Sequence, residues 1–211
     1  MTEVLLFHHA QGLTSGVRTF ADALRAAGHV VHTPDLYEGR TFDDLDAGVA
    51  HAEEVGFGTI VERGREAVDG LPSELVYAGF SLGVMPAQML AMTRPGATGA
   101  VFMHSAVPLS EFGGAWPPGV PLQIHLMEQD EFALEGDLDA ARELDATVDD
   151  AQLFLYPGDR HLFTDSSLPD HDEEAAALVV QRVLEFLGDV DRRSGAGVEP
   201  TQPGAARPHR F

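Results

Sequence analysis

The chain has 211 residues, of which 44% are hydrophobic, and it contains no cysteine. One domain of this size can bury most of its apolar surface, and the missing thiols exclude disulfides, thiolate catalysis and cysteine-based metal sites. The formal net charge of -21 opposes binding to DNA or RNA, whose phosphates are also negative. No run is apolar for long enough to be a signal-peptide core or a membrane span, so we expect a cytoplasmic protein that does not act at a membrane.

Apolar runs alternate with helical patterns along the chain, which predicts parallel βαβ units. Most of the runs are continuously apolar, as in strands that helices cover on both faces. The expected strands, in chain order, are Glu3–His9, Val30–Asp35, Glu74–Phe80, Gly99–Ser105, Leu122–Gln129 and Gln152–Tyr156. The expected helices between and after them are Ser15–Ala27, Phe42–Glu54, Gly58–Val68, Leu82–Met92, Leu134–Leu144 and Asp172–Leu187.

These elements predict a single α/β domain over residues 1–188. We expect a three-layer sandwich with about six parallel strands and right-handed crossovers. After Gly188 the sequence is rich in Gly, Pro, Ala and Arg without periodicity, which predicts a disordered tail over residues 189–211. No insertion is long enough for a lid domain, and only the loop Val107–Pro121 could cover part of a site.

The segment Gly79-Phe80-Ser81-Leu82-Gly83 fits the nucleophile elbow G-x-S-x-G, with an apolar strand before it and a helical run after it. The serine of this motif sits on a sharp strand-to-helix turn, and the glycines leave room for the crossing backbones. A chance serine in a small-residue turn would give the same five letters. The elbow therefore needs support from an acid and a histidine further along the chain.

Both partners occur in the required order, each after a predicted strand. Asp130 follows the fifth strand and His161 follows the sixth, so both belong at the carboxyl edge of the sheet, where such sites form. We predict that Ser81 is the nucleophile, His161 its base and Asp130 the acid that orients the base. The neighbouring acidic residues are rivals for the role of Asp130, namely Glu128, Glu131, Glu135, Asp159 and Asp165.

An oxyanion hole needs two backbone N–H donors. We expect one from Leu82, directly after the serine, and one from Ala10, in the loop after the first strand. The adjacent histidines of that loop, His8 and His9, would point to opposite faces of a strand, so they are not expected to chelate one metal. We predict no metal and no cofactor.

These residues together resemble the dienelactone hydrolase family of α/β-hydrolases, over about residues 3–187. His8-His9-Ala10-Gln11-Gly12-Leu13 is similar to the family's H-E-x-x-G-L loop, and Pro34-Asp35-Leu36-Tyr37 to its P-D-L-[YF]. The elbow stands where the family has G-x-C-x-G, and Asp130 and His161-Leu162-Phe163 match its acid and its H-x-F motif. The resemblance implies an α/β-hydrolase fold, with the parallel strands in the order 2-1-3-4-5-6. It also implies hydrolysis of esters or lactones without a cofactor.

The chain departs from the family pattern at three positions. Ser81 replaces the cysteine nucleophile, His9 replaces a glutamate that helps activate the thiol, and Asp165 replaces an arginine that helps hold a substrate carboxylate. An anionic substrate would meet Asp165 and a strongly acidic protein. We therefore expect a small neutral ester, thioester or lactone rather than a dienelactone.

Further residues are expected near the predicted strand ends and could line the pocket. The candidates for substrate binding are His9, Glu38, Arg40, His104 and Phe163, with Trp116 as a possible apolar wall. Two other functions stay open: a non-catalytic ligand-binding relative, and thioesterase, acyltransferase or amidase chemistry on the same triad. The composition does not distinguish a monomer from a homodimer.

Overall fold

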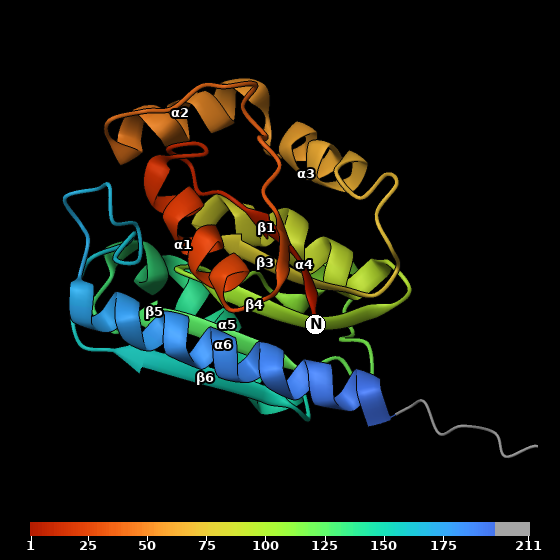
Figure 1. Ribbon diagram of the computed structural model, residues 1–211. Helices are drawn as coiled ribbons and strands as arrows, with labels where there is room; N and C mark the ends of the chain where they lie inside the picture. Colours follow the sequence, from red (N-terminus) through yellow and green to blue (C-terminus); the bar gives the residue numbers. More distant parts are fainter. Residues whose placement is uncertain (197–211) are drawn as a thin grey trace, which may run out of the picture.

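The computed structural model describes residues 1–196, which form a six-stranded parallel sheet flanked by helices (Figure 1). The sheet order is β2-β1-β3-β4-β5-β6, and every neighbouring pair is parallel. The predicted strand number, order and three-layer α/β architecture are therefore confirmed. The strands are β1 (Glu3–Phe7), β2 (Val30–His32), β3 (Leu75–Phe80), β4 (Ala97–Met103), β5 (Leu122–Met127) and β6 (Ala151–Tyr156).

Helices cover both faces of this sheet. One face carries α1 and α6, which lie beside each other in Figure 1 and contact one another. The other face carries the remaining α-helices. The helices are α1 (Ser15–Ala26), α2 (Leu45–Val55), α3 (Phe57–Glu66), α4 (Val84–Thr93), α5 (Leu138–Thr147) and α6 (Glu173–Ala196).

The side chains of each central strand divide between two hydrophobic clusters. In β1, Val4 and Leu6 pack under α1 and α6, whereas Leu5 and Phe7 pack toward the opposite helices. This division follows from the two-residue period of a strand. Burial on both faces explains why the strands read as continuous apolar runs, and it makes the sheet a rigid base for loops at its carboxyl edge.

Two helix starts and one strand end differ from the predicted bounds for local reasons. Strand β2 ends at His32, because Pro34 cannot donate a ladder hydrogen bond. Helix α2 begins at Leu45, because the carboxylate of Asp44 accepts the Ala47 N–H at 2.8 Å and caps it. Helix α5 begins only at Leu138, because Gly136 has φ +146° and interrupts the irregular turn that runs from Ala133 to Asp137.

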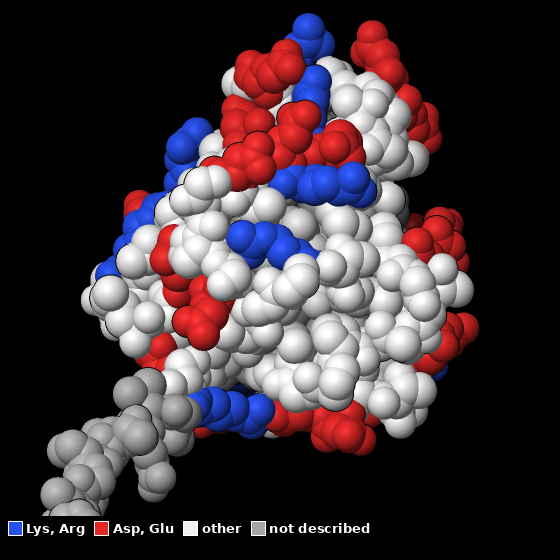
Figure 2. All heavy atoms as spheres, turned by 90° about the vertical axis from the view of Figure 1, so that its right-hand side faces the viewer, with Lys and Arg blue, Asp and Glu red and all other residues white. Residues whose placement is uncertain are grey.

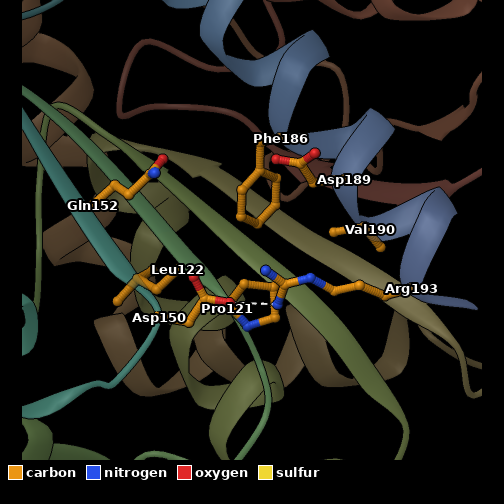
Figure 3. A pocket seen from close by; sticks show the side chains of 8 residues that line it. All are labelled: Pro121, Leu122, Asp150, Gln152, Phe186, Asp189, Val190 and Arg193. Atoms are coloured by element: carbon orange, nitrogen blue, oxygen red, sulfur yellow. Dashed lines mark hydrogen bonds and ion pairs between the residues drawn. The ribbon is translucent and has the colours of Figure 1, made fainter.

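The predicted start of a disordered tail at residue 189 is wrong. Helix α6 continues to Ala196, and its last turns pack against the amino ends of β5 and β6 (Figure 3). Val190 is only 4% exposed, and Arg193 pairs with Asp150. The weak apolar periodicity after Gly188 hid these contacts. The rest of the predicted tail lies outside the described residues.

Candidate active site

Ser81 lies directly after β3, at the turn into the helical segment that leads to α4. Its φ of +48° is in the left-handed region that side chains rarely adopt. A Cβ on Gly79 would collide with the backbone of Gly83, and one on Gly83 would lie 2.6 Å from the carbonyl oxygens of Phe7 and His8. Both glycines are therefore required by the close crossing of β1, β3 and the turn. The sharp turn makes the Ser81 side chain project from the carboxyl edge of the sheet.

The structure brings Ser81, His161 and Asp130 together in one hydrogen-bonded chain. The Oγ of Ser81 lies 2.7 Å from Nε2 of His161, and Nδ1 of His161 lies 2.7 Å from Oδ2 of Asp130. Asp130 is 1% exposed, and its other oxygen accepts the N–H of Phe132. The carboxylate thus holds the proton of the imidazole on Nδ1. This leaves Nε2 free to accept the serine proton.

The two predicted oxyanion donors lie on the segments that flank Ser81. Leu82 follows Ser81 in the short 3₁₀ turn, and Ala10 belongs to the loop after β1. A Cβ on Gly48 would collide with the carbonyl of Ala10, so this glycine lets α2 lie directly against the loop. Gly12, with φ +91°, turns the chain back beyond Ala10.

His9 is placed behind the triad and not in the open pocket. Its side chain is 1% exposed, and Nε2 lies 2.8 Å from Oδ2 of Asp165. Nδ1 accepts the N–H of Gln11 at 3.2 Å. Both ring nitrogens are therefore occupied within the protein, and the substrate contact predicted for His9 is not seen. Asp165 is also buried, so the expectation that its carboxylate would meet a substrate is wrong.

His104 and Phe163 form a buried layer next to the triad. The His104 ring lies 6.1 Å from that of His161 and 4.7 Å from that of Phe163, and its Nε2 bonds Oγ1 of Thr164 at 2.7 Å. Burial lowers the pKa of His104 well below its ordinary value, so the ring is neutral. His104 and Phe163 are at most 1% exposed. They pack behind the site and do not line its open hollow.

Glu38 and Arg40 are not brought to the triad. They line a separate hollow with Tyr37, His51 and neighbouring residues, and Glu38 pairs with Arg63 at 2.9 Å. The loop after β2 turns away at Glu38, whose φ is +57°. The prediction that this loop follows β2 at its carboxyl end is right, but the predicted direction of the Glu38 and Arg40 side chains is wrong.

A hollow of about 360 Å³ opens beside His161. Its apolar wall comes from Phe132 and Leu45, and the Phe132 ring lies 4.6 Å from that of His161. Phe132 is 42% exposed, so an aromatic face remains available to a ligand. No sequence pattern predicted a role for Phe132, although its place two residues after Asp130 was a usable signal. The other lining residues are Gln129, Asp130, Glu131, Asp159 and Asp170.

Asp137 is a second residue near the triad that sequence reasoning missed. Burial raises its pKa, and hydrogen bonding to Ser105 and to the Ala106 backbone, together with the nearby His161, opposes this rise in part. Its position depends on the irregular turn before α5, which no sequence pattern announced. Within residues 1–196, no group of three or more His, Asp or Glu side chains is placed to hold a metal ion.

The parallel sheet in this order, with a serine on a strained strand-to-helix turn and an acid and histidine after later strands, defines an α/β-hydrolase. The chain belongs to the dienelactone hydrolase family, whose sequence model matches residues 1–190. It is accordingly a carboxylic ester hydrolase. No curated protein matches the chain.

Solved structures of low sequence identity share this fold. A protein described as m3DLH superposes with a TM-score of 0.71 at 20% identity, covering 90% of this chain and 86% of the other. A dienelactone hydrolase-like promiscuous phosphotriesterase from metagenomic libraries gives 0.71 at 18% identity, with 90% and 87% coverage. The dienelactone hydrolase of Anabaena variabilis gives 0.63 at 20% identity, with 89% and 86% coverage. No helix within residues 1–196 is both long and apolar enough to span a membrane.

Proposed function

We propose that the chain hydrolyses a small ester or lactone through an acyl-enzyme on Ser81, without a cofactor. The observation that carries this proposal is the continuous hydrogen-bonded chain from Ser81 through His161 to Asp130, with 2.7 Å at each link. A serine hydroxyl becomes a useful nucleophile only when a base removes its proton. The two hydrogen bonds support His161 as that base, with Asp130 favouring the tautomer that carries its proton on Nδ1.

In the proposed reaction, Oγ of Ser81 attacks the acyl carbon while Nε2 of His161 accepts the hydroxyl proton. Asp130 stabilises the imidazolium that forms. The N–H groups of Ala10 and Leu82 receive the oxyanion, and each contributes roughly 3–4 kcal/mol to transition-state stabilisation. The imidazolium then protonates the leaving oxygen. Finally His161 activates water, which attacks the acyl-enzyme and releases the acid.

The surroundings of the hollow favour a neutral substrate. Three carboxylates line it besides that of Asp130, and no Lys or Arg is among the described residues that do. Acidic side chains, with some arginines among them, also gather on the opposite side of the molecule, where α6 ends (Figure 2). A substrate carboxylate would be repelled by the carboxylates that line the hollow. A neutral ester, thioester or lactone would not.

The test is to label the protein with a fluorophosphonate and to assay p-nitrophenyl acetate, thioesters and lactones with the wild type and with Ser81→Ala. We expect labelling at Ser81, and a loss of turnover by a factor of roughly 10³ or more in the variant. A wild type that neither labels nor hydrolyses would indicate a non-catalytic binding protein. Thioester or amide turnover above ester turnover would reassign the chemistry on the same triad. Cytoplasmic location and a monomeric or homodimeric state stay predictions.

A further inference from the structure

Two buried side chains behind the triad are in direct contact. The side chains of His9 and Asp165 are hydrogen-bonded at 2.8 Å. They come from loops that are far apart in the sequence, after β1 and after β6. Both side chains are at most 3% exposed. The two residues therefore form one buried acid–histidine pair.

The hydrogen bonds of His9 and Asp165 indicate which nitrogen of the His9 ring carries the proton. Because Nδ1 of His9 accepts the Gln11 N–H, the ring proton must be on Nε2, which donates to Asp165. Oδ2 of Asp165 also accepts from Thr14 at 2.5 Å, and Oδ1 accepts the N–H and hydroxyl of Ser167 at 2.8 and 2.6 Å. Burial opposes ionisation, yet these bonds hold the pKa of Asp165 below its usual range. The carboxylate of Asp165 thus accepts the Nε2 hydrogen bond of His9 and three further hydrogen bonds.

The pair lies where three segments of the proposed mechanism meet. His9 precedes the donor Ala10 and binds the backbone of Gln11. Its ring meets that of Phe80, the residue before the nucleophile, edge to face at 6.4 Å. Asp165 lies four residues after His161 on the same loop. Through these contacts one buried pair connects the oxyanion loop, the elbow and the loop of the base.

We propose that His9 and Asp165 are a positioning pair, which sets the distance between the oxyanion loop and the His161 loop, and that neither contacts the substrate. This inference rests on the proposed function. Asp165 is turned inward beside Gly16, where a Cβ would collide with the carboxylate, so this position supplies no group for a substrate anion.

The test compares His9→Gln with His125→Gln. His125 is a matched control, because it is fully buried and both of its ring nitrogens are bonded, to Tyr156 and Gln123 at 2.9 Å, away from the triad. We expect both variants to lose thermal stability. Only His9→Gln should lower kcat for p-nitrophenyl acetate, by roughly 10- to 100-fold with KM within about twofold, because a misplaced oxyanion donor weakens the transition state alone.

Asp165→Asn and the double variant show whether the two residues act together. We expect the double variant to lose no more in kcat than the worse single variant, since each change breaks the same link. Equal kcat for His9→Gln and His125→Gln, or losses that multiply in the double variant, would overturn the positioning pair. If the His9 variants do not fold, nitrogen NMR of the wild type at pH 7 decides: an Nδ1-protonated His9 overturns the proposal, and an Nε2-protonated ring supports it. If fluorophosphonate does not label Ser81 in the wild type, both this proposal and the proposed function are refuted. If Ser81 is labelled but His9→Gln and His125→Gln have equal kcat, only the positioning pair is refuted.

Discussion

Backbone strain is concentrated at the edge of the sheet that carries the site. Ser81 and His104, with φ of +48° and +69°, each follow directly after a strand, and their strands are paired at Phe80 and Met103. The strained residues therefore lie side by side. Strain of this kind persists only where the surrounding packing enforces it, and it is common at catalytic sites. The buried ring of His104 stacks on Phe80 and supplies part of that packing.

The turn that carries Ser81 leaves no room for a side chain at Gly83. We predict that Gly83→Ala destabilises the protein by at least ~1–3 kcal/mol and abolishes labelling of Ser81, because the new methyl would meet backbone oxygens that cannot move aside. Chemical denaturation and fluorophosphonate labelling measure the two effects. Gly58→Ala is the control, since no atom lies within 4 Å of its added Cβ and alanine favours a helix. A labelled Gly83→Ala protein of normal stability would contradict this account of the turn.

Phe132 offers a test of the hollow beside His161. We predict that Phe132→Ala lowers kcat/KM for aromatic esters by up to about tenfold, as expected for the loss of one aromatic contact. Stability should change little, because the ring is 42% exposed. Leu134→Ala is the matched control, since Leu134 is 60% exposed and does not line the hollow. Equal kinetics for the two variants would show that substrate does not lie against Phe132.

Among the elements of residues 1–196, every strand and every α-helix was predicted from the sequence, but several of their ends were misplaced. The ends depended on single interactions, such as the Asp44 cap on α2 and the left-handed Gly136 before α5. The largest error was at the end of α6. There the helix is held by tertiary contacts with β5 and β6, and those contacts have no signature in the local sequence.

The extension of α6 gives a prediction of its own. Val190 would be indifferent to substitution in a disordered tail, but it is buried against the sheet in the structure. We predict that Val190→Ala lowers the free energy of unfolding by about 1–3 kcal/mol, measured by urea denaturation. Arg192→Ala, at a side chain that is 74% exposed, should change it by less than about 0.5 kcal/mol. Equal effects would mean that this turn of the helix is not docked.

At the scale of the whole molecule, three fully buried histidines from different segments tie stability to pH. Burial lowers the pKa of His8 to about 4 and of His125 to about 3, and it lowers the pKa of His104 in the same direction. In the unfolded chain each would titrate near ~6.5. Below about pH 6.5 these histidines bind protons in the unfolded state but not yet in the folded state. Their contribution to the free energy of unfolding is therefore complete above about pH 6.5 and declines as the pH falls.

We predict a loss of roughly 1.4 kcal/mol per pH unit for each such histidine between about pH 6 and 5. Self-repulsion of the acidic chain weakens over the same range and opposes this loss. The informative quantity is therefore the difference in slope between the wild type and His125→Gln, from urea denaturation at several pH values. The variant should have the shallower slope. Parallel slopes would mean that His125 does not remain neutral in the folded protein.

Local patterns in the sequence were sufficient to predict the strands, the family resemblance and the chain order of Ser81, Asp130 and His161, because apolar runs, glycine spacing and residues at strand ends are all read along the chain. The strand order was predicted through that resemblance. Which side chains near the carboxyl edge of the sheet face the hollow followed only from the tertiary structure. It placed Phe132 there, turned Glu38 and Arg40 away, and joined His9 to Asp165 across 156 residues of sequence. The physical reason is that the direction of a loop side chain depends on packing and hydrogen bonds with segments that are distant in the chain.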